Sequence, residues 1–243
     1  MSKTSTKGIC RFCQGVFSKA AMTRHLETCT QRTEAAATGN QKATKTTRLV
    51  HLLVEGRDQP QYWMHLELPA EATLQTLDDF LRRTWLECCG HLSKFEIAGV
   101  SYASYPDREF GDKSMRVQVG TILSPGQQFF HEYDYGTPTE LRLKVVAVRE
   151  GEAKGKSIPV LARNEAPLIS CQVCGKPATE VCAQCIYEGG GWLCDACAEE
   201  HECGEEMLLP VVNSPRVGTC GYTGPTEWSG RCVTLMTMTP RQA

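Results

Sequence analysis

Residues 48–97 read RLVHLLVEGRDQPQYWMHLELPAEATLQTLDDFLRRTWLECCGHLSKFEI, and this stretch decides the fold of the chain. Two apolar segments, RLVHLLVEG and YWMHLELP, are separated by GRDQP, which predicts two β-strands joined by a turn. Thr73 then opens a predicted helix through TLQTLDDFLRRTWLECC. One face of this helix carries apolar residues at helical spacing: Leu74, Leu77, Leu81, Trp85 and Cys88.

Further strands are predicted at KFEIAGVSY, MRVQVGTIL, QQFFHEYDYG and ELRLKVVAVREG, with a short one at IPVL. Two strands, one amphipathic helix and several more strands indicate an α+β domain with a helix packed on a mixed or antiparallel sheet. We assign residues 47–163 to this domain, the only region large enough to bury an ordinary core. The predicted fold is thus a central sheet with one main packed helix, flanked by small zinc-stabilised modules.

The remaining residues of the 243-residue chain divide into four parts. Residues 8–30 form a compact Cys/His module, and residues 31–46 form a polar linker that we predict to be flexible. Residues 168–224 hold a second cysteine-rich module, and residues 225–243 form a tail predicted to be irregular.

The first module reads CRFCQGVFSKAAMTRHLETC, a Cys-x2-Cys-x11-His-x3-Cys pattern formed by Cys10, Cys13, His25 and Cys29. His25 and Cys29 are four residues apart, so they share one face of a helix. The module resembles a ββα zinc finger, with a final Cys instead of His and a gap one residue short. Zinc accepts thiolate and imidazole alike, so we expect one zinc ion here.

The second module contains three CxxC pairs, CQVC, CAQC and CDAC, followed by His201 and Cys203. Alternating pairs generally bind crosswise, which gives two sets of four ligands. The first predicted set is Cys171, Cys174, Cys194 and Cys197, and the second is Cys182, Cys185, His201 and Cys203.

The ligand spacing of this module resembles that of the B-box, and more loosely that of MYND and HIT fingers. Cys220 is an alternative to Cys203 as the last ligand, and Cys232 is a remoter one. Both sets supply four protein ligands, the pattern of structural rather than catalytic zinc. With the finger, the sequence predicts three zinc ions.

The N-terminal residues MSKTSTKG are polar and lack the apolar core of a secretory signal, so we expect a cytoplasmic protein. In a reducing compartment, fourteen cysteines favour metal binding over the alternative of a secreted chain with seven disulfides. Cys88 and Cys89, on the predicted helix, are interpreted as ordinary buried thiols. No apolar run reaches the length of a membrane span, roughly 18 residues.

Charge is distributed unevenly along the chain. Residues 1–48 carry nine Lys/Arg and two Asp/Glu, whereas residues 164–243 carry four and ten. A basic N-terminal region predicts an anionic partner such as nucleic acid for residues 1–48. The candidate phosphate contacts are Lys7, Arg11, Lys19 and Arg24. The finger is poor in residues that read base edges, so a structural or protein-binding finger is the alternative.

The segment from Thr47 to Gly151 carries a His-Leu-x-x-Phe-x-Ile strand, at His91, Leu92, Phe95 and Ile97, and a Tyr-Asp-aromatic-Gly turn at residues 133–136. With the opening strand RLVHLLVEG, these features resemble the plasmid pRiA-type open-reading-frame-three-like family of mobile elements. The acidic-Trp continuation typical of that family is replaced by TPTEL. The whole layout is similar to longer members with zinc modules on both sides, the insertion-sequence passenger proteins of TnpR type.

The sequence contains no phosphate loop, dinucleotide fingerprint, HExxH motif or nucleophile elbow. His131, Glu132 and Asp134 are adjacent, but strand alternation places His131 on the opposite face from the two carboxylates. We therefore predict a non-enzymatic adaptor of mobile-element context with no small-molecule substrate, contacting nucleic acid weakly and protein elsewhere. The rivals are a purely protein-interaction or structural zinc protein, and an enzyme with an unrecognised site in residues 47–151.

Overall fold

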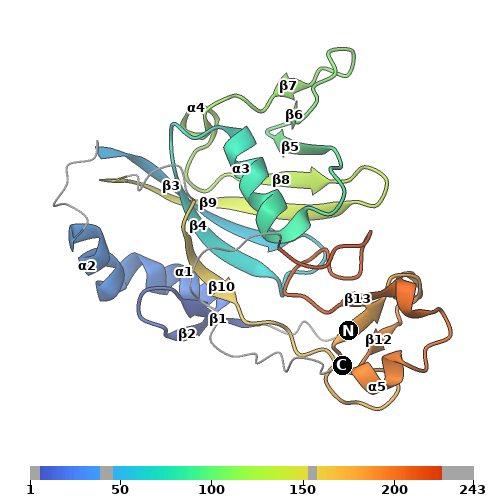
Figure 1. The fold of residues 1–243 in the computed structure, drawn as a ribbon. Helices are drawn as coiled ribbons and strands as arrows, with labels where there is room; N and C mark the ends of the chain where they lie inside the picture. Colours follow the sequence, from blue (N-terminus) through green and yellow to red (C-terminus); the bar gives the residue numbers. More distant parts are fainter. Residues whose placement is uncertain (1–5, 39–45, 153–157, 226–243) are drawn as a thin grey trace.

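The computed structural model describes residues 6–38, 46–152 and 158–225 (Figure 1). Ten strands form one large sheet in the order β2-β1-β10-β4-β3-β9-β8-β5-β6-β7. Neighbouring strands are antiparallel except the pair β6 and β7. The strands are β1 (Lys7–Cys10), β2 (Val16–Ser18), β3 (Thr46–Gly56), β4 (Trp63–Pro69), β5 (Ser93–Ile97), β6 (Val100–Ala103), β7 (Lys113–Ser114), β8 (Gln128–Tyr133), β9 (Thr139–Glu152) and β10 (Val160–Asn164). The predicted α+β class, with its central sheet and flanking cysteine clusters, is confirmed.

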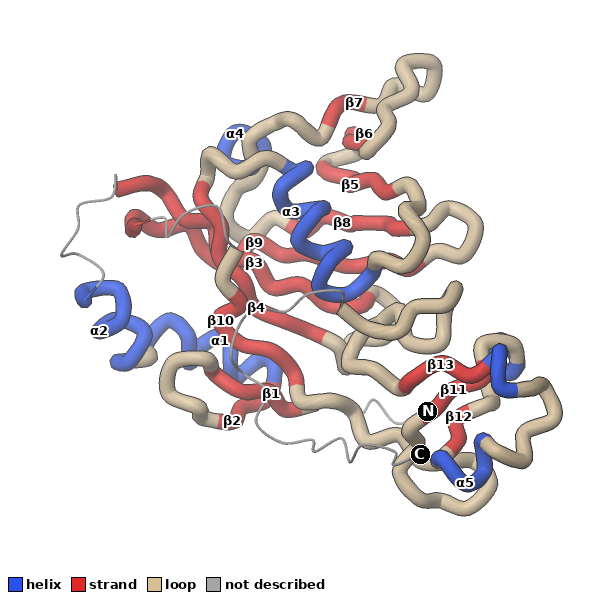
Figure 2. The backbone as a smooth tube through the Cα atoms, viewed as in Figure 1, coloured by secondary structure: helices blue, strands red, loops and turns tan. Residues whose placement is uncertain are grey.

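Helix α3 (Leu74–Leu81) lies across one face of this sheet (Figure 2). The Thr73 side chain caps it by accepting a hydrogen bond from the Thr76 backbone N–H. The helix continues as one π-helical turn, η2 (Arg82–Leu86), and ends where Glu87 becomes extended. The predicted apolar face holds as far as Trp85, but Cys88 and Cys89 lie beyond the helix and not on it.

The predicted strand MRVQVGTIL is wrong over most of its length. Only its neighbours Lys113–Ser114 form β7, and Val119–Ile122 form the short helix α4. Met115, Val119 and Leu123 are all buried, but Met115 lies in the turn after β7, Val119 begins α4 and Leu123 ends it. The alternation of Met115, Val117 and Val119 in the sequence imitates a strand.

The N-terminal finger is part of the large sheet. Its hairpin β1–β2 is followed by α1 (Lys19–Thr28), and β1 pairs with β10, which in turn pairs with β4. Residues 31–38 of the predicted flexible linker belong to helix α2 (Thr30–Thr38), while residues 39–45 lie outside the described residues. The IPVL segment supplies part of β10.

The finger and α3 cover opposite faces of β3 and β4. Val50, Leu52 and Val54 of β3 belong to the core that contains α3. Leu53 and Trp63 contact the cluster that contains Met22 and Leu26 of α1. Successive residues of a strand point to opposite faces, so the two helices lie on opposite sides of the sheet. Burial of both faces explains why the opening strands are apolar almost without alternation.

The C-terminal module is a separate three-stranded sheet in the order β12-β11-β13. Its elements are β11 (Glu180–Cys182), η3 (Cys185–Glu188), β12 (Trp192–Leu193), α5 (Asp195–Ala198), η4 (Glu205–Met207) and β13 (Leu208–Pro210). The chain then returns to the central domain, where Ser214, Arg216, Val217 and Tyr222 are buried. The predicted irregular tail, from residue 226 onward, lies outside the described residues. Within the described part of the chain, no helix is long and apolar enough to cross a membrane.

Candidate metal centres

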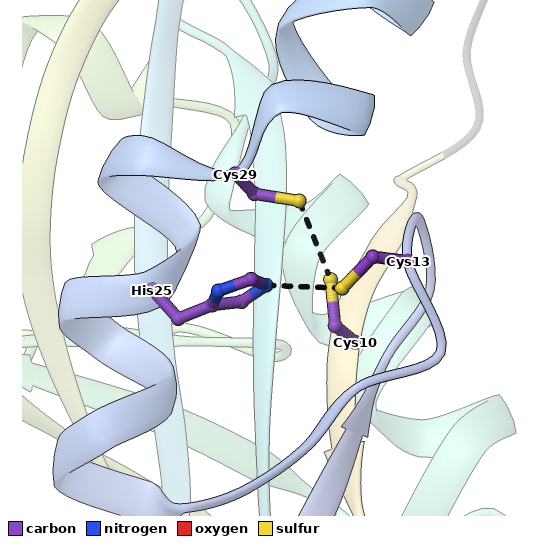
Figure 3. A group of neighbouring side chains, drawn as sticks. All are labelled: Cys10, Cys13, His25 and Cys29. Atoms are coloured by element: carbon purple, nitrogen blue, oxygen red, sulfur yellow. Dashed lines mark hydrogen bonds between the residues drawn. The ribbon is translucent and has the colours of Figure 1, made fainter.

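Cys10, Cys13, His25 and Cys29 converge on one point between the hairpin and α1 (Figure 3). Their ligand atoms all lie within 4.8 Å of one another. Cys10 Sγ is 4.0 Å from Cys29 Sγ, and Cys13 Sγ is 3.2 Å from His25 Nε2. The Phe17 ring stacks on the His25 imidazole with the centroids 4.1 Å apart, which orients the imidazole.

These separations suit a tetrahedral metal. With Zn–S of about 2.3 Å and Zn–N of about 2.0 Å, two ligand atoms on one zinc ion lie roughly 3.5–3.8 Å apart. The four donors come from the end of β1, the following turn, α1 and the extended residue Cys29 that caps α1, so the hairpin and helix are both needed to build the group. The finger therefore has a ligand set that could hold one metal ion.

The C-terminal module contains two such groups. Cys171, Cys174, Cys194 and Cys197 form the first, in which Cys174 Sγ is 3.5 Å from Cys194 Sγ. The second joins the following four residues within 4.8 Å: Cys182, Cys185, His201 and Cys203.

Cys203, and not Cys220, lies in the second group of this module. Cys185 Sγ is 3.6 Å from both His201 Nε2 and Cys203 Sγ. Cys232 lies outside the described residues. Successive pairs of ligands along the chain belong alternately to the first and the second group, which is a crosswise pairing.

In each C-terminal group, backbone N–H groups favour the thiolate form of at least one cysteine, which is the form that binds metal. The neighbouring thiols raise the pKa of Cys185 and of Cys197 to about 12. Desolvation acts to raise the pKa of Cys182, but the Cys185 backbone N–H and the His201 side chain outweigh it and lower that pKa from 9.0 to about 6. At Cys171, desolvation is likewise outweighed, chiefly by the backbone N–H of Cys174, and the pKa falls to about 6. None of the thirteen cysteines in the described residues forms a disulfide.

A fourth group was not predicted from the sequence. Cys88, Cys89, His91 and Cys220 also have ligand atoms within 4.8 Å of one another. The interpretation of Cys88 and Cys89 as buried thiols is wrong, because Cys88 is half-buried and Cys89 is exposed. The run CCGH at residues 88–91 was the available signal, but the remaining ligand is more than a hundred residues away.

The candidate phosphate contacts have unequal surroundings. Lys7, Arg11 and Arg24 are exposed, and no ion pair involves them among the described residues. Lys19 is half-buried, forms an ion pair with Glu55 of β3, and donates a hydrogen bond to the Pro60 carbonyl at 3.2 Å. Lys19 thus connects α1 to the sheet, which leaves three exposed basic side chains in the predicted set.

His131, Glu132 and Asp134 do not converge on a common point. His131 is fully buried and its Nε2 lies 2.7 Å from Asp78 Oδ1 of α3, inside the core. Asp134 adopts a left-handed turn with φ of 69° and accepts hydrogen bonds from the backbone of Gly136 and Thr137. The polar residues of this strand therefore serve packing and turn formation.

The chain resembles known proteins in its central region. A search of curated proteins found no match. Among solved structures, the crystal structure of a protein of unknown function from Methanosarcina mazei Go1 aligns with a TM-score of 0.42 at 14% sequence identity, over 48% of this chain and 68% of that one. The sequence model of the plasmid pRiA4b ORF-3-like proteins matches residues 49–186, more than half of the chain. On this match, the chain belongs to the plasmid pRiA4b ORF-3-like protein family.

Proposed function

We propose that this protein is a non-enzymatic zinc-binding adaptor whose metal ions are structural. The observation that carries the proposal is the completeness of the ligand sets. Each of the three groups in the finger and C-terminal module brings four Cys or His donors together. Four protein ligands fill a tetrahedral zinc ion and leave no position for a reacting water or substrate.

Zinc is the metal that these donors favour. Thiolate and imidazole in tetrahedral sets of Cys₄ and Cys₃His composition select zinc over the oxygen-seeking magnesium and calcium ions. Three ions, one in the finger and two in the C-terminal module, follow from the proposal. Free thiols in this number suit a cytoplasmic protein, since a reducing compartment keeps them in the ligand form.

The C-terminal module supports a protein contact. Leu168, Val173 and Tyr187 are 96%, 72% and 65% exposed. Five exposed glutamates lie close in sequence to His201 and Cys203: Glu199, Glu200, Glu202, Glu205 and Glu206. We propose a protein partner with basic and apolar side chains for this module, because the acidic surface repels phosphates.

The finger supports a weak nucleic-acid contact through Lys7, Arg11 and Arg24, which are exposed and lack ion-pair partners among the described residues. Three basic side chains provide affinity for phosphates without sequence reading. The family resemblance to mobile-element passenger proteins makes nucleic acid a reasonable partner.

A purely structural finger is the second candidate. It is favoured by the pairing of β1 with β10 and by the contact of Lys19 with Glu55, which tie the finger to the central sheet. In that case the finger completes the sheet and has no partner outside the chain.

Matched triple variants distinguish these candidates. The finger variant carries Lys7→Ala, Arg11→Ala and Arg24→Ala, and the control carries Arg108→Ala, Lys113→Ala and Arg116→Ala, which remove the same charge from exposed residues elsewhere. Binding to a fluorescent DNA or RNA oligonucleotide is measured at several salt concentrations. The proposal expects salt-dependent binding that falls at least about tenfold in the finger variant and changes little in the control.

Equal loss in both variants indicates a non-specific charge effect, and absence of binding at low salt removes the nucleic-acid contact. After either result, the purely structural finger is the remaining candidate. Elemental analysis of the 243-residue chain tests the metal half of the proposal, and at least three zinc ions per chain are the expected result.

A further inference from the structure

We infer that Cys88, Cys89, His91 and Cys220 form a further metal site, which takes a thiolate-preferring divalent ion of the zinc class and fastens the returning C-terminal segment to the central domain. The site lies outside the three groups used in the proposed function. Three of its ligands occupy the connection between η2 and β5, and the fourth comes from the segment that follows the C-terminal module.

The distances in this group match those in the finger. His91 Nε2 is 3.3 Å from Cys220 Sγ, and Cys89 Sγ is 3.9 Å from the same sulfur. The corresponding separations in the finger are 3.2 Å and 4.0 Å. Three thiols and one imidazole directed at one point give a Cys₃His set, a recognised composition for structural zinc.

The surroundings of His91 are those of a metal-bound imidazole. Its Nε2 faces Cys220, while its Nδ1 faces Asp134 Oδ1 at 3.5 Å. A metal-ligating histidine commonly directs its second nitrogen to a carboxylate, which fixes the tautomer and the ring orientation. Asp134 itself is held by Arg216, whose Nη2 donates to Asp134 Oδ2 at 2.7 Å.

Arg216 also provides a charge that the site needs. Its Nη2 lies 3.4 Å from Cys88 Sγ, and the whole side chain is buried. A divalent ion bound by three thiolates has a net negative charge, and a buried guanidinium beside one of the sulfurs offsets it. The same arginine donates to the carbonyl of Thr137 and the hydroxyl of Thr139, which fixes its position.

The backbone brings the ligands into range at two left-handed positions. Gly90 has φ of 77°, which turns the chain between Cys89 and His91 and suits glycine. Cys220 has φ of 49°, a conformation that a cysteine adopts only at a cost. Coordination of its thiol is an interaction that offsets this cost.

The segment that carries Cys220 is anchored independently of the metal. The Ser214 hydroxyl donates to the Trp85 carbonyl at 2.6 Å, and Val217 and Tyr222 are buried on either side of the cysteine. The metal ion would therefore close a loop whose ends are already in place, between the end of η2 and the last described residues.

A Cys89–Cys220 disulfide is the competing use of these thiols. It would leave Cys88 and His91 without a role, although both converge on the same point. It also requires the two sulfurs to approach to about 2.05 Å, well inside their present separation. The convergence of four donors favours a metal ion.

Zinc per chain, measured by elemental analysis on the full-length protein, tests the inference. We expect four equivalents in the parent protein, three in Cys220→Ser and three in Cys89→Ser. Thr219→Ser, which changes the residue beside Cys220 and removes no metal donor, is the control and should retain four. Cys220→His should restore the fourth equivalent, since imidazole replaces thiolate as a zinc ligand.

A second measurement needs no variant and so avoids any folding defect. Cys89 is exposed, and in the metal-loaded protein its alkylation by iodoacetamide, followed by peptide mass spectrometry, should be slow until a chelator is added. Immediate alkylation of Cys89, or a Cys89–Cys220 disulfide in the purified protein, would overturn the inference. A zinc content of three equivalents in the parent protein that is unchanged in Cys220→Ser would overturn it as well. That result would leave the proposed function intact.

Discussion

Asp78 and His131 form a hydrogen bond inside the apolar core, where both side chains are fully buried. The carboxylate comes from α3 and the imidazole from β8, so the bond ties the helix to the sheet. His131 Nδ1 has no hydrogen-bond partner among the described residues. Loss of the carboxylate would therefore leave the whole imidazole unpaired.

Asp78→Ala should lower the free energy of unfolding by about 2–4 kcal/mol, because a buried polar group without its partner keeps its desolvation cost. Asp79→Ala is the matched control on the exposed face of the same helix and should change stability by no more than about 0.5 kcal/mol. Urea unfolding of both variants measures the difference. Similar losses of unfolding free energy in the two variants would show that helix propensity, and not the buried hydrogen bond, explains the effect.

His51 and His65 form a second buried polar pair, on the finger side of the sheet. His51 Nε2 lies 2.9 Å from His65 Nδ1, and His65 Nε2 lies 3.3 Å from the Thr23 hydroxyl of α1. Burial, with neighbouring positive charges, lowers the pKa of His51 to about 2 and that of His65 to about 3.

These shifts predict a loss of stability in acid. In the unfolded chain each imidazole takes up a proton as the pH falls through about 6.5, whereas in the folded protein it stays neutral until about pH 2 or 3. The unfolded state binds more protons over this window, so stability falls as pH falls. At pH 5 each histidine should cost about 2 kcal/mol relative to neutral pH.

Acid also protonates the thiolate ligands, so the two contributions must be separated. His51→Gln removes one of the two titrating groups and leaves every cysteine cluster unchanged. Its stability loss between pH 7 and pH 5 should be smaller than that of the parent protein by about 2 kcal/mol, measured by urea unfolding at each pH. Equal losses in the two proteins would contradict the role of His51.

At the scale of elements, the junction between β1 and β10 attaches the finger to the sheet, and it depends on Gly8. Gly8 pairs with Asn164, and a Cβ at Gly8 would lie 2.4 Å from the Arg163 carbonyl oxygen and 2.5 Å from the Trp63 ring. Neither neighbour is the free end of a flexible side chain. A residue larger than glycine therefore forces the two strands apart.

Gly8→Ala should weaken this junction by about 1–3 kcal/mol while the finger keeps its zinc, because none of the four ligands changes. Amide hydrogen exchange should show faster exchange in β1 and β10. Gly136→Ala is the matched control, since its Cβ would meet only Asp134 Oδ1 at an ordinary 3.5 Å. Unchanged protection in β1 of the Gly8 variant would show that the junction tolerates a methyl group.

Elements set by local pattern could be predicted from the sequence, and those set by distant contacts could not. The Thr73 cap and the apolar face of α3 follow from neighbouring residues, and so do the CxxC pairs. The end of the helix does not, because Cys88 continues the apolar spacing while Glu87 leaves the helix and accepts from the Gly90 N–H and the Tyr133 hydroxyl.

Neither the docking of the finger on the sheet nor the Cys220 cluster could be predicted, because both depend on residues far apart in the sequence. β1 meets β10 across more than 150 residues, and no local signal specifies that pairing. The ion pair of Arg32 with Glu67, which holds α2 on the sheet, joins residues 35 apart in the sequence. The sequence therefore predicts the modules but not their attachment to the central domain.

At the scale of the whole molecule, the two metal-bearing modules depend on the rest of the chain to different extents. The finger shares its core with the sheet, since Met22 and Leu26 of α1 cluster with Trp63 and Leu161. The C-terminal module shares no strand with the large sheet, and of its buried apolar side chains only Val181 belongs to the central core among the described residues. Metal binding therefore supplies a larger part of its folding energy. Loss of a ligand should therefore have different consequences in the two modules.

Cys174→Ser should remove zinc from one C-terminal site and abolish hydrogen-exchange protection in β11, β12 and β13, while β3 and β9 of the central sheet stay protected. Cys13→Ser should empty the finger and also speed exchange in β10 and β4, because these strands share its core. Zinc analysis and amide exchange on both full-length variants measure the two patterns. Loss of protection in β3 and β9 in the Cys174 variant would mean that the whole chain unfolds as one unit, and the metal sites would then stabilise the central domain itself.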